Sequence, residues 1–262
     1  MTVAGSALIF GRASLDDAMA GLARLGFRTV ELAALEGWAH IAPSRLTQDF
    51  ATELHAVRDA LAAAQLTPIA INAGLGAADP VEQERRAAAL FDLAAALGCG
   101  VVTLPAGPPG EGVEAMARRL RPLHALAMSR GVALAVETHM GAITEDPAVG
   151  AELCRALPGL RLTLDPSHYW AGLAKGRGWE ATIPFVAHVH LRDAGMGGWD
   201  EIQMWPGRGA IPFPDVVAAL QRGGYAGSWA VEYIDSLPVK AGTQAAEAAS
   251  EMLRQSADWG LV

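Results

Sequence analysis

The chain has 262 residues, of which 52% are hydrophobic, and carries a formal net charge of -8 with a pI of about 5.3. This acidic balance lacks the basic face that binds phosphate backbones, so we expect no nucleic-acid partner. No apolar run approaches the roughly 20 residues of a membrane span, the N-terminus has no signal-peptide pattern, and the two cysteines, Cys99 and Cys154, form no CxxC pair, so we expect a cytoplasmic protein without membrane contact.

Short apolar runs alternate with longer amphipathic segments along the whole chain. Helices are expected to begin at capping residues such as Ser14 and to end at glycines such as Gly26 and Gly98. The predicted strands are 6–10, 28–35, 67–74, 100–107, 132–138, 160–165, 186–191 and 228–234. The predicted helices are 14–25, 46–64, 79–97, 112–130, 147–158, 179–185, 214–222 and 241–257, and a long loop rich in glycine and tryptophan covers 194–212.

Every predicted strand after the first follows a helix, which indicates parallel pairing through right-handed crossovers. Eight such units in one chain fit a closed (β/α)8 TIM barrel, and we expect a single α/β domain over residues 1–262. An open doubly wound sheet is the alternative. The count, the even repeat and the absence of GxGxxG after the first strand favour the barrel.

Four successive apolar runs end in side chains that can bind a metal. Glu137 follows VALAV, Asp165 follows LRLTL, His190 lies in VAHVHLRD, and Glu232 follows SWAV. The carboxyl ends of barrel strands converge on one mouth, so these side chains are expected to meet there. Three carboxylates and one imidazole suit Mn²⁺, Mg²⁺, Co²⁺ or Zn²⁺, and we expect one divalent ion, with Mn²⁺ first. Isolated solvated loop residues or ion pairs are the alternative, which would be preferred for a single glutamate.

Other residues near these strand ends are candidates for substrate contacts. His168 and His139 could hold a substrate hydroxyl, and Arg192 and Arg208 could anchor substrate oxygens. Structural roles are the alternative for each of them. The tryptophans expected to stack on a sugar-like substrate are Trp38, Trp199 and Trp205.

Two further histidines and a glutamate are harder to place. We expect His188, which alternates with His190, to point away from the mouth and pack against a helix. Glu31 and His40 could face the mouth, but core or surface roles are equally open.

The motifs VETHMGAIT, LTLDPSHYW, HVHLRD and AVEY, in this order and spacing, resemble those of the xylose isomerase-like TIM-barrel superfamily. That superfamily includes sugar isomerases and epimerases and the metal-dependent apurinic-site endonucleases. The resemblance implies that Glu137, Asp165, His190 and Glu232 bind one divalent metal. It also implies that Glu137 and Glu232 act as the catalytic acid/base pair and that His168 contacts substrate.

The sequence departs from the family pattern at two positions. Thr138 stands where the family usually has asparagine, and Met196 stands where the ketose epimerases carry an arginine. Arg192 or Arg208 would then have to supply the missing contact.

The resemblance leaves several functions open. The first is an isomerase or epimerase of a small sugar or hydroxy-carbonyl compound, in which the two glutamates transfer a proton through a metal-stabilised enediolate. The second is a dehydratase of the inosose or 3-dehydroshikimate type, which shares the proton abstraction. A phosphodiester hydrolase is disfavoured because its extra histidines are missing at Asn72, at Leu104 and in loop 194–212. A non-catalytic binding module is a further alternative. The expected partner is a small carbohydrate-like molecule, with a homo-oligomer possible.

Overall fold

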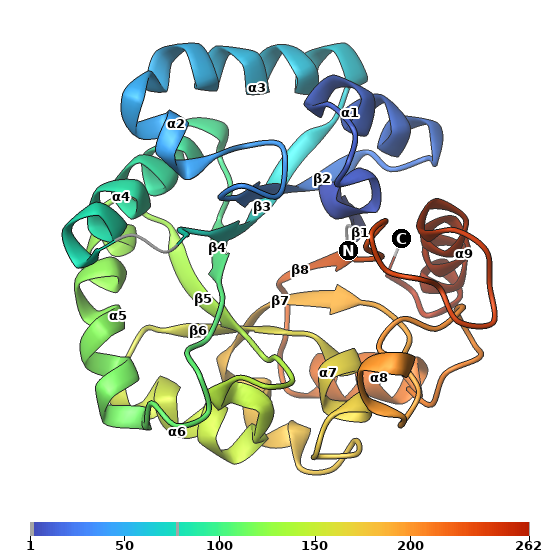
Figure 1. Cartoon of the computed structure of the whole chain (residues 1–262). Helices are drawn as coiled ribbons and strands as arrows, with labels where there is room; N and C mark the ends of the chain where they lie inside the picture. Colours follow the sequence, from blue (N-terminus) through green and yellow to red (C-terminus); the bar gives the residue numbers. More distant parts are fainter. Residues whose placement is uncertain (1–2, 77–78, 262) are drawn as a thin grey trace.

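The computed structural model describes residues 3–76 and 79–261 as a closed barrel of parallel strands (Figure 1). The strands follow one another around the barrel in chain order, and the last pairs with the first through Ala4 and Ala230. The predicted (β/α)8 TIM barrel is therefore confirmed. The strands are β1 (Val3–Ser6), β2 (Thr29–Leu35), β3 (Thr67–Gly74), β4 (Val101–Leu104), β5 (Ala133–Glu137), β6 (Arg161–Leu164), β7 (Val186–Leu191) and β8 (Ser228–Val231).

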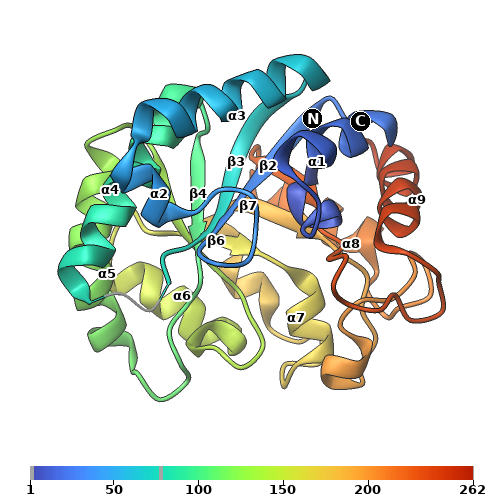
Figure 2. The ribbon, with the colours of Figure 1, turned by 45° about the horizontal axis from the view of Figure 1, so that its top comes forward.

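Helices surround the barrel on its outside (Figures 1 and 2). Most lie in the crossovers between consecutive strands, as parallel pairing requires. The α-helices are α1 (Leu15–Arg24), α2 (Pro43–Gln48), α3 (Phe50–Ala64), α4 (Pro80–Leu97), α5 (Val113–Met128), α6 (Pro147–Ala156), α7 (Pro166–Ala171), α8 (Phe213–Arg222) and α9 (Ala245–Asp258). The 3-10 helices are η1 (Ala7–Phe10), η2 (Ile143–Glu145), η3 (Trp179–Phe185) and η4 (Gly198–Glu201). Within residues 3–76 and 79–261, no helix is both long enough and apolar enough to cross a bilayer.

Some predicted elements were wrong for identifiable local reasons. The first strand is not 6–10 but β1, because the Ser6 side chain accepts a hydrogen bond from the Leu8 amide and starts η1. The helix expected over 46–64 is broken at Asp49, whose side chain caps α3 by accepting from the Thr52 amide. The shorter helix expected over 179–185 forms with these bounds as the 3-10 helix η3, which contains Pro184.

Helix α7, which begins directly after Asp165, is not among the predicted elements. The Asp165 carboxylate accepts a hydrogen bond from the Ser167 amide at 2.8 Å, and Pro166 occupies the first turn. An aspartate cap followed by proline is a recognised helix start. The short helix fixes both the Asp165 carboxylate and His168 at the mouth of the barrel.

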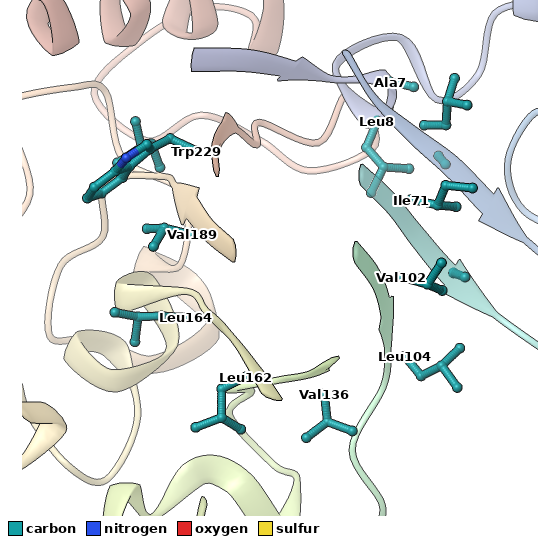
Figure 3. Packing of buried hydrophobic residues seen from close by; sticks show 14 of the residues in the cluster. Ala7, Leu8, Ile71, Val102, Leu104, Val136, Leu162, Leu164, Val189 and Trp229 are labelled. Carbon is teal, nitrogen blue, oxygen red and sulfur yellow. The ribbon is translucent and has the colours of Figure 1, made fainter. Parts of the chain in front are cut away.

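Strand alternation divides the barrel residues into two sets. The outward set packs under the helices and is apolar, as seen for Val102, Leu104, Leu162 and Leu164 (Figure 3). A separate small cluster of Ala70, Val101 and Ala135 fills part of the interior.

Many of the other inward residues are polar. Contacts between strands that are not neighbours must cross the interior. Thr103 of β4 lies 2.6 Å from Thr163 of β6 (Oγ1 to Oγ1). The Asn72 amide of β3 donates to Glu232, beyond β8, at 3.0 Å. Polar side chains thus line much of the barrel interior, and the carboxylates and histidines of the site lie among them.

Candidate metal centre

The four predicted ligands meet at the mouth of the barrel. Glu137 is the last residue of β5, Asp165 follows β6, His190 lies in β7, and Glu232 follows β8. One ligand atom from each lies within 4.8 Å of the others. His190 is central, because its Nδ1 lies 3.1 Å from Glu137 Oε1 and 3.5 Å from Glu232 Oε2.

Arg192 joins this group through its guanidinium. One Nη atom contacts Asp165 Oδ2, the other lies 3.4 Å from Glu232 Oε2, and Nε donates to Ser167 Oγ at 3.0 Å. The arginine is buried. It supplies a positive charge beside three carboxylates, and buried charges require such partners.

Glu31 lies on the other side of His190, inside the barrel. Its Oε1 is 2.9 Å from His190 Nε2 and 3.1 Å from His188 Nε2, and all three side chains are fully buried. Glu31 Oε2 and His188 Nε2 have no hydrogen-bond partner among the described residues.

The prediction that His188 points away from the mouth side was therefore wrong. Residues two apart on a strand share a face, so His188 and His190 both enter the interior. His188 Nδ1 lies 2.7 Å from Ser228 Oγ, and the ring meets His190 edge-on with a centroid distance of 5.3 Å.

The arrangement shifts the pKa values of these groups in different directions. Burial raises the pKa of Glu232 to about 7, despite the opposing His190 and Arg192. Burial also opposes ionisation of Glu31 and Glu137, but the histidines beside them hold both pKa values below the usual range. Burial disfavours the charged form of His190, yet Glu232 and Glu31 outweigh it and raise its pKa well above the usual value.

The residues present fit a divalent ion. Three carboxylates and one imidazole form a mixed oxygen and nitrogen donor set of the kind that binds Mn²⁺, Mg²⁺ or Zn²⁺. His190 presents Nδ1 to this set and Nε2 to Glu31. A ligating histidine usually gives its other nitrogen to a carboxylate in this way.

Thr138 supports the same group from behind. It is buried, and its Oγ1 accepts a hydrogen bond from the Asp165 amide at 2.9 Å. The residue that departs from the family pattern therefore ties the end of β5 to the end of β6.

A cavity of about 500 Å³ opens above the four ligands. Of the predicted substrate contacts, His139, His168, Arg192, Trp38 and Trp199 line it. The rings of His139 and His168 lie 4.0 Å apart, and Trp199 packs against both at 5.6 and 5.9 Å. Burial, together with nearby Arg192, lowers the pKa of His168 well below its usual value, which keeps this imidazole neutral.

Arg208 and Trp205 were expected at the cavity and do not line it. Arg208 is exposed, and Trp205 packs against Gly242 on the side of α9. Asp193 fixes part of loop 194–212. Its buried carboxylate accepts hydrogen bonds from the amides of Gly207 and Gly209 at 2.8 and 2.9 Å. These bonds tie the second half of loop 194–212 to the segment that follows β7.

Two contacts of the site were not predicted from the sequence, which left the placement of Glu31 open and gave Asn72 no role in the site. The contact from Glu31 to His190 joins β2 to β7, and that from Asn72 to Glu232 joins β3 to β8. The two-residue period of the strands is the signal that could have predicted these contacts. It identifies the residues of each strand that point into the barrel, and polar residues that point inward from distant strands share one interior.

Comparison with known proteins places the chain among barrels of this kind. The sequence pattern of the family described as "Xylose isomerase-like TIM barrel" matches residues 19–256. No curated protein matches the chain in sequence.

Several solved structures share the fold at low sequence identity. A D-allulose 3-epimerase from Methylomonas sp. is 19% identical with a TM-score of 0.75, over 99% of this chain and 98% of that chain. A xylose isomerase-like TIM barrel protein from Mycobacterium smegmatis, in complex with magnesium, is 15% identical with a TM-score of 0.78, over 100% and 98%. The probable 3-DHS dehydratase AsbF from Bacillus anthracis is 16% identical with a TM-score of 0.73, over 98% and 99%.

Replacement of Glu31 tests its support of His190. We predict that Glu31→Gln weakens Mn²⁺ binding about tenfold or more, because loss of the carboxylate lowers the basicity of His190 and frees its ring orientation. Titration calorimetry at pH 8.5, where protons compete least, measures the effect. The matched control is Glu180→Gln, an exposed glutamate of η3. Equal affinities for all three proteins would show that Glu31 does not support the metal ligand.

Metal binding should also depend on pH. In the metal-free protein, Glu232 has a pKa of about 7 and His190 holds its proton well above its usual pKa. A bound ion must displace these protons, so the apparent affinity for the metal should rise with pH. Each pH unit should strengthen binding about tenfold for each proton released. Calorimetry in two buffers of different ionisation enthalpy counts the protons. Release of no proton at pH 6.5 would contradict the assignment.

Proposed function

The chain belongs to the xylose isomerase-like TIM-barrel family, and on that premise we propose that it is a divalent-metal-dependent isomerase or epimerase of a small hydroxy-carbonyl compound. Glu137 and Glu232 are its proton-transferring residues. Glu137, Asp165, His190 and Glu232 are its metal ligands.

One observation carries this proposal. Of the four ligands, Glu137 and Glu232 line the cavity, whereas Asp165 and His190 are fully buried beneath it. Among the described residues, these two glutamates are the only carboxylates that line the cavity. They are the groups that a bound substrate would touch, and they come from strands separated by the two that carry Asp165 and His190.

The geometry suits removal and return of a proton on carbon. A divalent ion, when bound by these four residues, supplies a Lewis acid that polarises a carbonyl and balances charge on its oxygen. Glu137 directs Oε1 at His190, and Glu232 directs Oε2 at His190 while its Oε1 accepts a hydrogen bond from the Asn72 amide. One glutamate can take a proton from the carbon beside the carbonyl, and the other can deliver a proton to the opposite face or to the neighbouring carbon.

Two neighbouring side chains would orient the substrate. Neutral His168 lies in the cavity wall with its Nε2 at 3.0 Å from Arg192. Arg192 in turn holds Asp165 and Glu232 in place. A substrate hydroxyl beside His168 would therefore meet a polar group whose position is fixed by packing and hydrogen bonds.

Glutamine variants test the roles of the two glutamates. We predict that Glu137→Gln and Glu232→Gln each slow exchange of the substrate's α-hydrogen with deuterium by at least about 100-fold, because the amide keeps the shape of the side chain but is no base. Proton NMR measures the exchange with saturating Mg²⁺ and a panel of α-hydroxy ketones that includes dihydroxyacetone, D-allulose and 1-hydroxy-2-hexanone.

The control for this experiment is Glu180→Gln, which should behave as the wild type. Product identification separates an isomerase or epimerase from a dehydratase, which would lose water after the same first step. Absence of α-hydrogen exchange in the wild-type protein with every member of the panel would overturn the proposal.

A further inference from the structure

We propose that the substrate is amphipathic, with a hydroxy-carbonyl head at the metal ligands and an apolar, uncharged remainder. This inference rests on the proposed function and specifies its substrate class. It follows from the distribution of polar groups in the cavity, whose volume of about 500 Å³ exceeds what a three-carbon head needs.

The cavity has two unlike halves. The polar half contains Glu137, His139, His168 and Arg192 above β5, β6 and β7, and it extends to Glu232 at the end of β8 and Asn72 of β3. The other half stands above β8, β1 and β2, which lie across the closed barrel from β4, β5 and β6 (Figure 1). We call this second half the apolar wall. Its residues are Leu8, Leu35, Trp38, Ile234 and Leu237, together with Ile202, which reaches it from the loop after β7.

The backbone of the apolar wall is largely satisfied within the protein. The buried Gln203 side chain accepts from the Ile234 amide at 2.7 Å and donates to the carbonyls of Ile234 and Leu237, each at 3.1 Å. The Leu8 carbonyl accepts from the Asp235 amide at 3.2 Å. The Leu35 carbonyl accepts from the Trp38 amide at 3.1 Å.

A hydroxyl pressed against this wall would lose water and gain little in return. The wall offers carbon atoms of aliphatic side chains and the Trp38 ring, and a buried hydroxyl without a partner is unfavourable. A methylene or a ring face in the same place gains from its removal from water. A free sugar carries hydroxyls along its whole length and is therefore poorly matched to this half.

Charge excludes a phosphorylated tail. Among the described residues, Arg192 is the only lysine or arginine that lines the cavity, and its guanidinium is already paired with Asp165 and Glu232. Arg208 is exposed and turned away. A phosphate on the tail, away from the metal position, would find no unpaired lysine or arginine among the described residues that line the cavity.

Hydroxamic acids test the proposal by binding alone, because they chelate a divalent ion without reacting. We predict that affinity for the Mg²⁺-loaded protein rises about fourfold per methylene from acetohydroxamate through butyrohydroxamate to hexanohydroxamate. Titration calorimetry gives the Kd values. Butyrohydroxamate should bind at least tenfold tighter than threonohydroxamate, its trihydroxylated analogue of equal length. Phosphoglycolohydroxamate should bind more weakly than acetohydroxamate.

Variants of the apolar wall locate the effect. Leu237→Asn and Trp38→Ala, both at partly exposed positions, should reduce the gain per methylene, measured within each variant as the ratio of the Kd values for acetohydroxamate and hexanohydroxamate. The control is Met128→Asn, an exposed residue at the end of α5, which should retain the full gain.

The outcomes separate this inference from the proposed function. If the hydroxamates bind but chain length brings no gain, or if threonohydroxamate or phosphoglycolohydroxamate binds tightest, the apolar substrate is wrong and the metal-dependent site stands. If no hydroxamate binds to protein saturated with Mg²⁺, the metal site itself is wrong, and the inference fails with it.

Discussion

Each ring nitrogen of His190 faces a carboxylate on a different side of the imidazole, and the geometry of the rest of the site depends on the ring orientation that results. Nε2 faces Glu31 in the barrel interior, and Nδ1 faces Glu137 and Glu232 at the mouth. The imidazole is fully buried, so its orientation is fixed by these partners rather than by solvent. Because Glu31 occupies Nε2, Nδ1 is the atom left for the ligand group.

This constraint depends in turn on the closed barrel. Successive side chains of every strand point alternately into the barrel and towards the helices. The inward side chains of β2 and β7 therefore meet those at the ends of β5 and β8. The outward set supplies the hydrophobic core, including Val189 and Trp229 (Figure 3). Stability and chemistry are thus carried by alternate residues of the same strands. The interior can therefore hold a charged cluster while the helices still have an apolar surface to pack on.

The sequence predicted the parts of this arrangement that are local. Strand ends bearing Glu137, Asp165, His190 and Glu232 were visible as acidic or imidazole residues after apolar runs, and parallel pairing placed them at one mouth. Contacts across the barrel were not visible, because the partner of Glu31 lies 159 residues away along the chain.

Errors in detail also had physical causes. His188 lies on the same inward face as His190 and not on the face expected, because side chains two residues apart on a strand point the same way. Arg208 and Trp205 were expected at the cavity because loop 194–212 follows the strand that carries His190, but neither residue lines it. The second half of the loop is tied to Asp193, whose carboxylate accepts hydrogen bonds from the amides of Gly207 and Gly209. Hydrogen bonds from distant backbone amides to a side chain carry no sequence pattern, whereas η4 near the start of the same loop still brings Trp199 to the cavity.

The most direct test is the position of the ion in crystals grown with Mn²⁺. An anomalous difference map should show one strong peak per chain at about 2.0–2.4 Å from His190 Nδ1 and from oxygens of Glu137, Asp165 and Glu232. The interior also offers a second group of possible ligands, Glu31, His188 and His190. A peak bound to His190 Nε2 within that group, or no peak at the mouth at saturating Mn²⁺, would contradict this account.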